Sequence, residues 1–478
     1  MPPKLHADDR NQIIRVVILS LLLDLISFTF ILPLFPKLLE YYRDREAPSL
    51  LLKDAPQTLL QQVLGALNAY KSSFSRPIDS RYDIVLLGGA LGSLFSLLQA
   101  ISSPIIGRLS DKYGRRKALL TSMAGNILSV LLWVAAVDFR TFVASRIVGG
   151  LFEGNVQLAT AIATDLSDDA SRGPTMALIG ACFSVAFTFG PALGAFLASI
   201  TSLSANPFAM AAGFSLALVV VETVYLYRHL PETLPSLIDE SQFQNKYRYQ
   251  YPYRKDDEDE QAAQQQAQQQ QQQQQQQLAR EEPAARAERA NSHVLLNATH
   301  FFFLLFFSGM ESSMTFLSYD LFGFTSGRNG RLLGFIGLVA SVFQGMFTRR
   351  MPPLVSVRCG VAACLAAFVL LGRIASVAGL YLAAFFLAVT SATVVTGLNA
   401  LSSFEAAEDE RGSKLGNLRS WGQLGRGLGP ILFTSVYWWA GREVAYSLGA
   451  VGIAGVLAVT LLGLKKPNSL EKEKEKGE

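Results

Sequence analysis

Long apolar segments are the feature that most limits how this chain can fold. A membrane-spanning helix needs about 20 mainly apolar residues, and the sequence offers twelve such segments. Half of the residues are hydrophobic and 17% are charged, whereas about 25% of an average soluble domain is charged. The sequence therefore predicts an all-α, multi-pass membrane protein with twelve transmembrane helices. The expected spans are residues 13–39, 83–107, 118–137, 140–161, 175–199, 207–228, 293–319, 330–349, 355–372, 376–400, 414–439 and 444–464.

Basic residues between the spans predict the orientation of the chain. They gather in the connection between spans two and three (Arg108, Lys112, Arg115, Arg116, Lys117) and in the one between spans eight and nine (Arg349, Arg350, Arg358). Cytosolic connections carry an excess of Lys and Arg, so these connections and both termini are expected in the cytosol. The loop between spans one and two (40–82, the 1–2 loop) is also basic, although this orientation places it outside the cytosol. The conflict is weak, because long loops cross membranes with little regard to charge. Residues 58–71 of this loop have helical apolar spacing and are expected to lie on the outer surface.

The middle of the chain differs in composition from both sides. Residues 232–292 contain an acidic run at 256–260 and ten consecutive Gln at 268–277. Such a tract cannot bury enough apolar surface to fold, so we expect a disordered cytosolic linker. It separates a six-helix half at 1–231 from a second at 293–464, which a charged cytosolic tail at 465–478 follows. Two pseudo-symmetric halves joined in this way fit a monomeric transporter with parallel repeats.

Ionisable residues inside the expected spans indicate a functional site. Each costs about 2.5–3.5 kcal/mol at the bilayer centre, so such residues are expected to face the bundle interior or a water-filled path. Asp24 and Arg146 are predicted to form an ion pair that binding of a proton or an anionic solute would open. An ion pair that only fixes helix packing stays the alternative. The expected substrate and proton-coupling residues are Asp24, Arg146, Glu153, Glu311, Gln423 and Arg426.

The stretch "GRLSDKYGRRK" between spans two and three carries a second candidate site. Gly107 permits close approach of another helix, and Gly114 permits a turn without strain. Asp111 can accept hydrogen bonds from Arg115 or from the N-terminal end of a neighbouring helix. With Arg116, these residues are predicted to form a cytosolic gate.

This pattern resembles the hallmark loop between helices two and three of the major facilitator superfamily. "RIVGG" at 146–150 resembles the fourth-helix motif of that superfamily, in which Arg146 is the embedded base. "GPALG" at 190–194 resembles its antiporter motif and singles out Gly190, Pro191 and Gly194, although Ala195 departs from the usual second glycine. "FTRRMPP" after span eight lacks the Asp and Gly pattern, so the second gate is expected to be degenerate.

The resemblance implies the superfamily fold and a secondary active transporter without a cofactor. It further implies proton-coupled antiport of small amphipathic organic ions by alternating access, with organic anions and drug-like solutes as substrates. The residues alone leave the charge of the solute open, since both acids and bases are present. A facilitator of cationic, zwitterionic or lipid-like solutes, or a non-transporting receptor or scaffold, are the alternatives. The resident membrane is equally open: plasma membrane, organelle or nuclear membrane.

Several function classes are disfavoured by the sequence. A net charge of +4, with basic residues placed between apolar runs, does not indicate nucleic-acid binding. The three cysteines lie within apolar runs and predict no metal site, and the four histidines fall at or outside the span ends without an H-E-x-x-H motif. A phosphate-binding G-x-x-x-x-G-K-[ST] motif is absent, so ATP is not expected to drive the protein.

Overall fold

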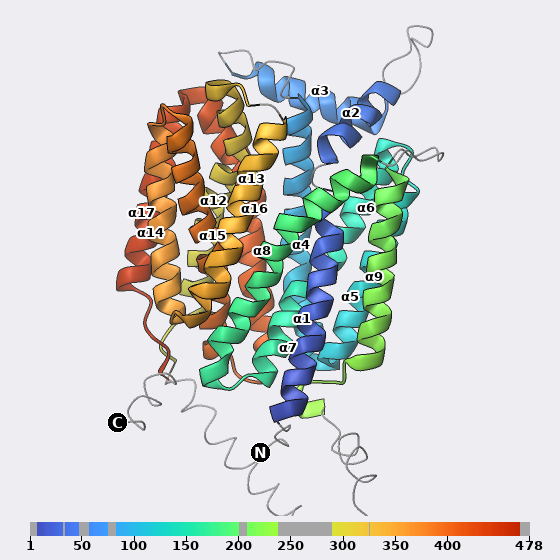
Figure 1. Cartoon of the computed structure of the whole chain (residues 1–478), viewed down its shortest axis with the longest axis vertical. Coiled ribbons are helices and arrows are strands. Elements are labelled where there is room, and N and C mark those ends of the chain that lie inside the picture. The colour runs from blue at the N-terminus through green and yellow to red at the C-terminus, as the bar shows by residue number, and fades with distance from the viewer. Residues whose placement is uncertain are drawn as a thin grey trace, which may run out of the picture.

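The computed structural model describes residues 7–31, 34–46, 57–74, 83–199, 208–237, 289–324 and 326–468. These residues form helices and connecting turns, without a strand among them. The long helices run in one direction or its opposite as a single bundle (Figure 1). α1 begins and α17 ends at the same end of this bundle, which we call the terminal face; α2 and α3 cover the opposite face.

The N-terminal half contains helices α1 to α9. Their bounds are α1 Ala7–Thr29, α2 Phe35–Arg45, α3 Leu59–Ser72, α4 Asp83–Tyr113, α5 Arg115–Val134, α6 Phe139–Phe152, α7 Asn155–Leu166, α8 Asp169–Ser199 and α9 Ala209–His229. The C-terminal half contains α12 His293–Phe322, α13 Ser326–Met346, α14 Pro353–Gly372, α15 Val377–Glu405, α16 Arg411–Ala440 and α17 Arg442–Leu462. Two 3-10 turns, η2 Pro235–Leu237 and η3 Thr348–Arg350, follow α9 and α13.

The predicted twelve-span fold is confirmed. Within the described residues, ten helices are long and apolar enough to cross a membrane. The two remaining spans are not among these ten helices, for different reasons. The fourth is divided into α6 and α7, which are 14 and 12 residues long, and α16 carries many glycines together with several basic residues.

Two spans that were predicted as continuous helices are each divided into two helices. The span expected at 13–39 ends at Thr29, and a separate helix, α2, starts at Phe35. Pro36 stands in the first turn of α2, where a proline without an N–H costs no intrahelical hydrogen bond. The span expected at 140–161 is interrupted at Glu153 and Gly154, which are not helical.

Each half has its own apolar core. In the C-terminal half, the rings of Phe368, Phe433 and Tyr446 meet among α14, α16 and α17. In the N-terminal half, apolar side chains of α1, α5, α7, α8 and α9 form one cluster, and a second lies nearer α2 and α3. The halves contact each other mainly through α4 against α16 and through α8 against α13 and α15. These two seams are the places where a movement between the halves would act.

The expected surface helix of the 1–2 loop is present as α3, which lies across the opposite face (Figure 1). Thr58 caps it through a capping box with Gln61, which satisfies two N–H groups of its first turn. The Tyr70 hydroxyl and the Ser435 hydroxyl of α16 are 2.8 Å apart, so α3 connects the two halves at this face. The predicted linker lies largely outside the described residues, including all of 268–277.

Candidate functional site

Asp111 joins the last turn of α4 to the first turn of α16. Its carboxylate accepts the backbone N–H groups of Gly412 (2.8 Å) and Ser413 (2.6 Å), which stand at the positive end of the α16 dipole. The guanidinium of Arg115 donates to the same carboxylate at 2.6 Å. Both partners expected for Asp111 from the sequence are therefore present at once.

Glycines bring the backbones of α4 and α16 into contact beside Asp111. A Cβ atom on Gly107 would overlap the carbonyl oxygen of Gly412. A Cβ on Gly416 would lie 2.6 Å from the carbonyl oxygen of Ser103, closer than carbon and oxygen atoms can approach without bonding. The expected role of Gly107 in a close helix approach is thus present, and its partner is a glycine of the other half.

Asp165, on α7, completes a charge network between the halves. Its buried carboxylate accepts from Arg115 of α5 at 2.8 Å and from Arg411 of α16 at 3.2 Å. The side chains of Arg115 and Asp165 are fully buried, and that of Arg411 is 8% exposed. We call Asp111, Arg115, Asp165 and Arg411, with the first turn of α16, the terminal latch.

The remaining predicted gate residues support the latch from within the N-terminal half. Gly114 has a φ of 104°, a conformation that favours glycine, and it turns the chain from α4 into α5. Glu232, from the "LPETLP" segment, accepts the backbone N–H groups of Arg115 (2.8 Å) and Arg116 (3.3 Å) at the start of α5. The Arg116 guanidinium donates to the Tyr227 carbonyl of α9, so it connects α5 to α9 within the N-terminal half.

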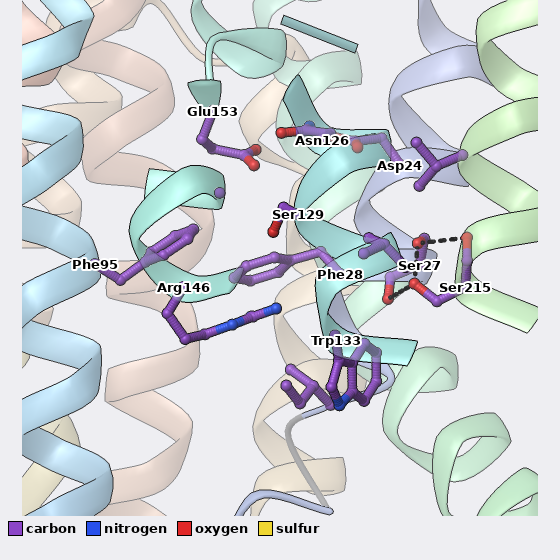
Figure 2. Close-up of a pocket in the computed structure, with 14 residues that line it drawn as sticks. Asp24, Ser27, Phe28, Phe95, Asn126, Ser129, Trp133, Arg146, Glu153 and Ser215 are labelled. Atoms are coloured by element: carbon purple, nitrogen blue, oxygen red, sulfur yellow. Dashed lines mark hydrogen bonds between the residues drawn. The ribbon is translucent and has the colours of Figure 1, made fainter. Parts of the chain in front are cut away.

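A pocket lies within the N-terminal half, among α1, α4, α5, α6 and α9 (Figure 2). We call it the N-terminal pocket. Asp24, Glu153 and Asn126 lie at one end of it, and Arg146 and Trp133 lie at the other. In this view the rings of Phe28 and Phe95, whose centroids are 5.8 Å apart, lie between Arg146 and Glu153. The pocket therefore separates its acidic groups from its basic group by an aromatic layer.

The break in the fourth span places Glu153 in this pocket. The Glu153 N–H still donates to the Gly149 carbonyl, but Gly154 donates to Phe152 in a tight turn, and α7 begins anew at Asn155. A Cβ on Gly154 would lie 2.6 Å from the Ser122 hydroxyl oxygen of α5, so the turn fits only because glycine stands there. Interrupted helices are tolerated at membrane depth where they line a cavity, which is the situation here.

Arg146 has aromatic neighbours in place of the predicted acidic partner. No ion pair joins it to Asp24 or to any other described residue. Its guanidinium lies over the rings of Phe142 (5.5 Å to the centroid) and Trp133 (6.0 Å) and donates to the Ser145 hydroxyl at 3.3 Å. The predicted Asp24–Arg146 ion pair is therefore wrong, because the two side chains project into different ends of the pocket.

Asp24 lies instead among polar groups of other helices. It is 4% exposed, and one carboxylate oxygen has no hydrogen-bond partner among the described residues. Asn126 of α5 and Asn155 of α7 flank it, and the charge of Arg419, on α16 of the other half, acts on both Asp24 and Glu153. The acidic end of the pocket thus faces a base that belongs to the C-terminal half.

The predicted site residues of the C-terminal half lie apart from the pocket. Glu311 of α12 and Arg426 of α16 form an ion pair of 3.5 Å, and both side chains are nearly half-exposed. Gln423, on α16, is partly buried. All three lie on α12 and α16, and none lines the N-terminal pocket.

The antiporter-like motif is a close contact between α8 and α1. A Cβ on Gly190 would overlap the Thr29 hydroxyl, and a Cβ on Gly194 would overlap the backbone of Phe30. α8 continues past Pro191 to Ser199, while the side chain of Pro191 is outside the described residues. The motif thus fixes α8 against the end of α1 that leads into the pocket.

Sequence reasoning missed several residues that the fold brings to these sites. Asp165 and Arg411 lie just outside the ends of predicted spans, whereas Glu222 lies inside the span predicted at 207–228, where a complete census of acids in apolar segments would have found it. Asn126 and Asn155 gave no signal of their own. His300, which was placed at a span end, lies two turns inside α12 and is 4% exposed; its Nδ1 atom is 2.9 Å from the Leu418 carbonyl oxygen.

Comparison with known proteins agrees with this architecture. A family model described as Major Facilitator Superfamily matches residues 17–430. Major facilitator superfamily domain-containing protein 10 of Mus musculus is 34% identical over 441 residues, which cover 92% of this chain and 90% of the mouse protein. Tetracycline resistance protein, class G, of Vibrio anguillarum is 34% identical over 136 residues, which cover 28% of this chain and 34% of that protein.

A solved structure shows the same arrangement over almost the whole chain. The crystal structure of the human organic anion transporter MFSD10 (TETRAN) superposes with a TM-score of 0.76 at 29% sequence identity, covering 94% of this chain and 99% of the human one. The resemblance inferred from the "GRLSDKYGRRK", "RIVGG" and "GPALG" segments is therefore confirmed.

Proposed function

The chain belongs to the Major Facilitator Superfamily of membrane transporters, and from this premise we propose that it exchanges small amphipathic organic ions for protons. The similarity to an organic anion transporter and to tetracycline resistance proteins supports this class of solute. The observation that carries the proposal is the N-terminal pocket, whose buried acids and partly buried base have no ion-pair partners among the described residues.

Arg146 is the proposed contact for the anionic group of the solute. A guanidinium removed from water costs several kcal/mol when no anion accompanies it, and the rings of Trp133 and Phe142 recover only part of this. A carboxylate of the solute would supply the missing charge as a bidentate partner, and a phenolate would supply it through its single oxygen. Phe28 and Phe95 would then contact an aromatic body attached to that anion.

Asp24 and Glu153 are the proposed sites of competition between proton and solute. Exchange requires that the proton and the solute compete for the same acid. A solute with only an anionic group would bind better when these acids are protonated, and it would then cross the membrane together with the protons. A solute that carries a hydrogen-bond donor or cationic group beside its anionic group meets this requirement. Tetracycline, which has both kinds of group, is therefore a more informative probe than a simple aromatic carboxylate.

The two halves, 1–231 and 293–464, are the proposed moving units of alternating access. In the present conformation the terminal latch holds α4, α5 and α7 to α16 at one face. Opening it would expose the acidic end of the pocket and separate Arg419 from Asp24 and Glu153. Gly190 and Gly194 would keep α8 on α1 during this movement, and Glu311, Gln423 and Arg426 would line the C-terminal side of the path.

The terminal face is the proposed cytosolic face, in a monomeric protein. It carries the basic residues 108–117 and 349–350, as the positive-inside rule requires, and the linker that joins the halves starts and ends there. Antibody labelling of an epitope added after residue 478 tests this: labelling only after the membrane is permeabilised supports it, and labelling of intact cells contradicts it.

Uptake into vesicles tests the exchange. Purified protein in liposomes should accumulate tetracycline when a proton gradient is imposed, and Asp24→Asn should abolish the dependence on that gradient. Asp44→Asn is the control, because Asp44 is an exposed acid of α2 outside the pocket. Tetracycline uptake that stays gradient-driven in Asp24→Asn would exclude Asp24 as a proton-coupling residue.

A further inference from the structure

Glu222, in the middle of α9, is a buried acid outside the sites described above. It is 1% exposed and forms no ion pair with a described residue. The Ser20 hydroxyl of α1 donates to its Oε1 atom at 2.7 Å, and its Oε2 atom has no hydrogen-bond partner in the described part of the chain. Ser20 precedes Asp24 by one helical turn, so Glu222 and Asp24 lie along the same face of α1.

The charged groups around Glu222 are acidic. Asp24 of α1 and Glu153, at the break between α6 and α7, are the titratable groups that act on it. On α5, charged residues are confined to the first turn at 115–117, and α8 contributes Cys182, whose thiol lies against the Ile18 and Leu178 carbonyls. On α9 itself, the titratable residues Tyr225 to His229 lie at the C-terminal end, where Arg116 of α5 contacts the backbone.

Three buried acids therefore share one region with two bases: Arg419 acts on Asp24 and Glu153, and Arg146 acts on Glu153. Neither base acts on Glu222, and a third negative charge beside Asp24 and Glu153 is unfavourable, because like charges in a medium of low polarity repel strongly. Glu222 has one hydrogen-bond donor and no base, so it is the acid that loses most by ionising. Groups that interact in this way bind and release protons as a set.

We infer that Glu222 is a proton-binding site of the transport cycle, coupled to Asp24 and Glu153. It holds a proton in the present conformation, and it exchanges that proton when the charge of the pocket changes. This inference rests on the proposed proton exchange for its place in the cycle, although the proton on Glu222 can be measured without any solute.

A purely structural role for Glu222 makes a different prediction. In that case the Ser20–Glu222 hydrogen bond fixes α1 to α9 and the charge of the acid is irrelevant. Glu222→Gln separates the two roles, because an amide oxygen still accepts the Ser20 hydroxyl but the side chain cannot ionise. Ser20→Ala is the matched variant, because it removes the hydrogen bond and keeps the acid.

Thermal unfolding of the purified full-length protein as a function of pH tests the inference. An acid that stays protonated when folded and ionises when unfolded makes the folded state lose stability as the pH rises. The Tm of Glu222→Gln should therefore exceed that of the wild type by an amount that grows with pH, while Ser20→Ala should differ from the wild type by a constant amount. A Tm difference between Glu222→Gln and the wild type that is the same at every pH would overturn the inference.

The place of Glu222 in the cycle is tested with tetracycline-loaded vesicles. Glu222→Gln should lower the number of protons exchanged per tetracycline, and an unchanged ratio would contradict a role in transport. Wild-type vesicles that exchange no protons would instead refute the proposed function, and the pH dependence of Tm would still decide whether Glu222 holds a proton.

Discussion

The terminal latch and the N-terminal pocket are both built from buried charges, but they treat those charges in opposite ways. In the terminal latch, every charged side chain has an oppositely charged or helix-dipole partner. Two of these contacts, Arg411 with Asp165 and Asp111 with the first turn of α16, connect the two halves. In the N-terminal pocket, Asp24, Glu153 and Arg146 lie within one half and form no ion pair with described residues. A set of paired charges favours one conformation, whereas unpaired buried charges favour the arrival of a ligand or a proton.

This difference assigns separate tasks to the two regions. If the halves move as proposed, pairs between them exist only while that face is closed, so these pairs would set how often the terminal face opens. Charges inside one half remain together whichever face is open, so they can keep hold of a solute throughout the cycle. Variants of the terminal latch should therefore change rates, and variants of the pocket should change which solutes and how many protons move.

The largest effect is expected at the contact between the α4 and α16 backbones. Gly107→Leu would force a side chain into the carbonyl of Gly412, so the terminal face could not close and tetracycline uptake should be lost. Gly89→Leu, on the same helix, is the control, because a Cβ there meets nothing within 4 Å. Substantial uptake by Gly107→Leu would show that closure of this face does not need the α4–α16 contact.

The second effect concerns the base of the pocket. Arg146→Ala should reduce the kcat/KM for tetracycline by about 100-fold, since truncating one partner of a desolvated charge pair costs about 2–5 kcal/mol. Arg146→Lys keeps the charge but loses the planar geometry of the guanidinium, so it should retain more activity. If the alanine and lysine variants are equally active, the charge at this position does not bind the solute.

A smaller effect, on stability, should separate paired from exposed charges. Asp165→Asn removes the buried carboxylate that Arg115 and Arg411 share, which costs about 3–5 kcal/mol and should lower Tm by about 10 °C. Asp168→Asn, two residues beyond Leu166, removes an exposed acid that lies 3.9 Å from Arg10 and should barely change Tm. Equal shifts in the two variants would mean that the terminal latch adds no stability to this conformation.

The smallest effect is expected at the opposite face, where one hydroxyl contact joins α3 to α16. Tyr70→Phe removes the hydrogen bond with Ser435, which contributes about 1 kcal/mol, and keeps the ring that packs on Phe74. Tetracycline uptake should change by less than about fivefold. A loss as large as that of a terminal latch variant would show that this face is also held by a strong contact.

The sequence predicted the fold and the terminal latch better than the pocket. Spans follow from local hydropathy, and Asp111 and Gly107 stand in a short pattern whose meaning depends on near neighbours. Asp165 and Arg411 were missed because their role arises only when α7 meets α16. The pairing of Asp24 with Arg146 was wrong because helical faces do not reveal that a break at Glu153 redirects the chain.

The difference between the two regions also explains which single residues were hard to foresee. Glu222 and Asn126 acquire significance from the helices they face, and those contacts join residues more than a hundred positions apart. Gly154 looks like an ordinary small residue of a transmembrane helix until the Ser122 side chain is seen beside it. Periodicity identifies a face, but it does not identify what the face meets.

The most direct test of the separation of tasks is a competition measurement with Asp111→Asn. Uptake of tetracycline by this variant and by the wild type is measured in the presence of a series of aromatic carboxylates and amines. Loss of a charge-assisted hydrogen bond to the end of α16 costs about 1.5–3 kcal/mol, so the turnover rate should change at least tenfold while the order and ratio of the competitors stay as in the wild type. A changed order of competitors would contradict the account, because it would place the terminal latch among the residues that select the solute.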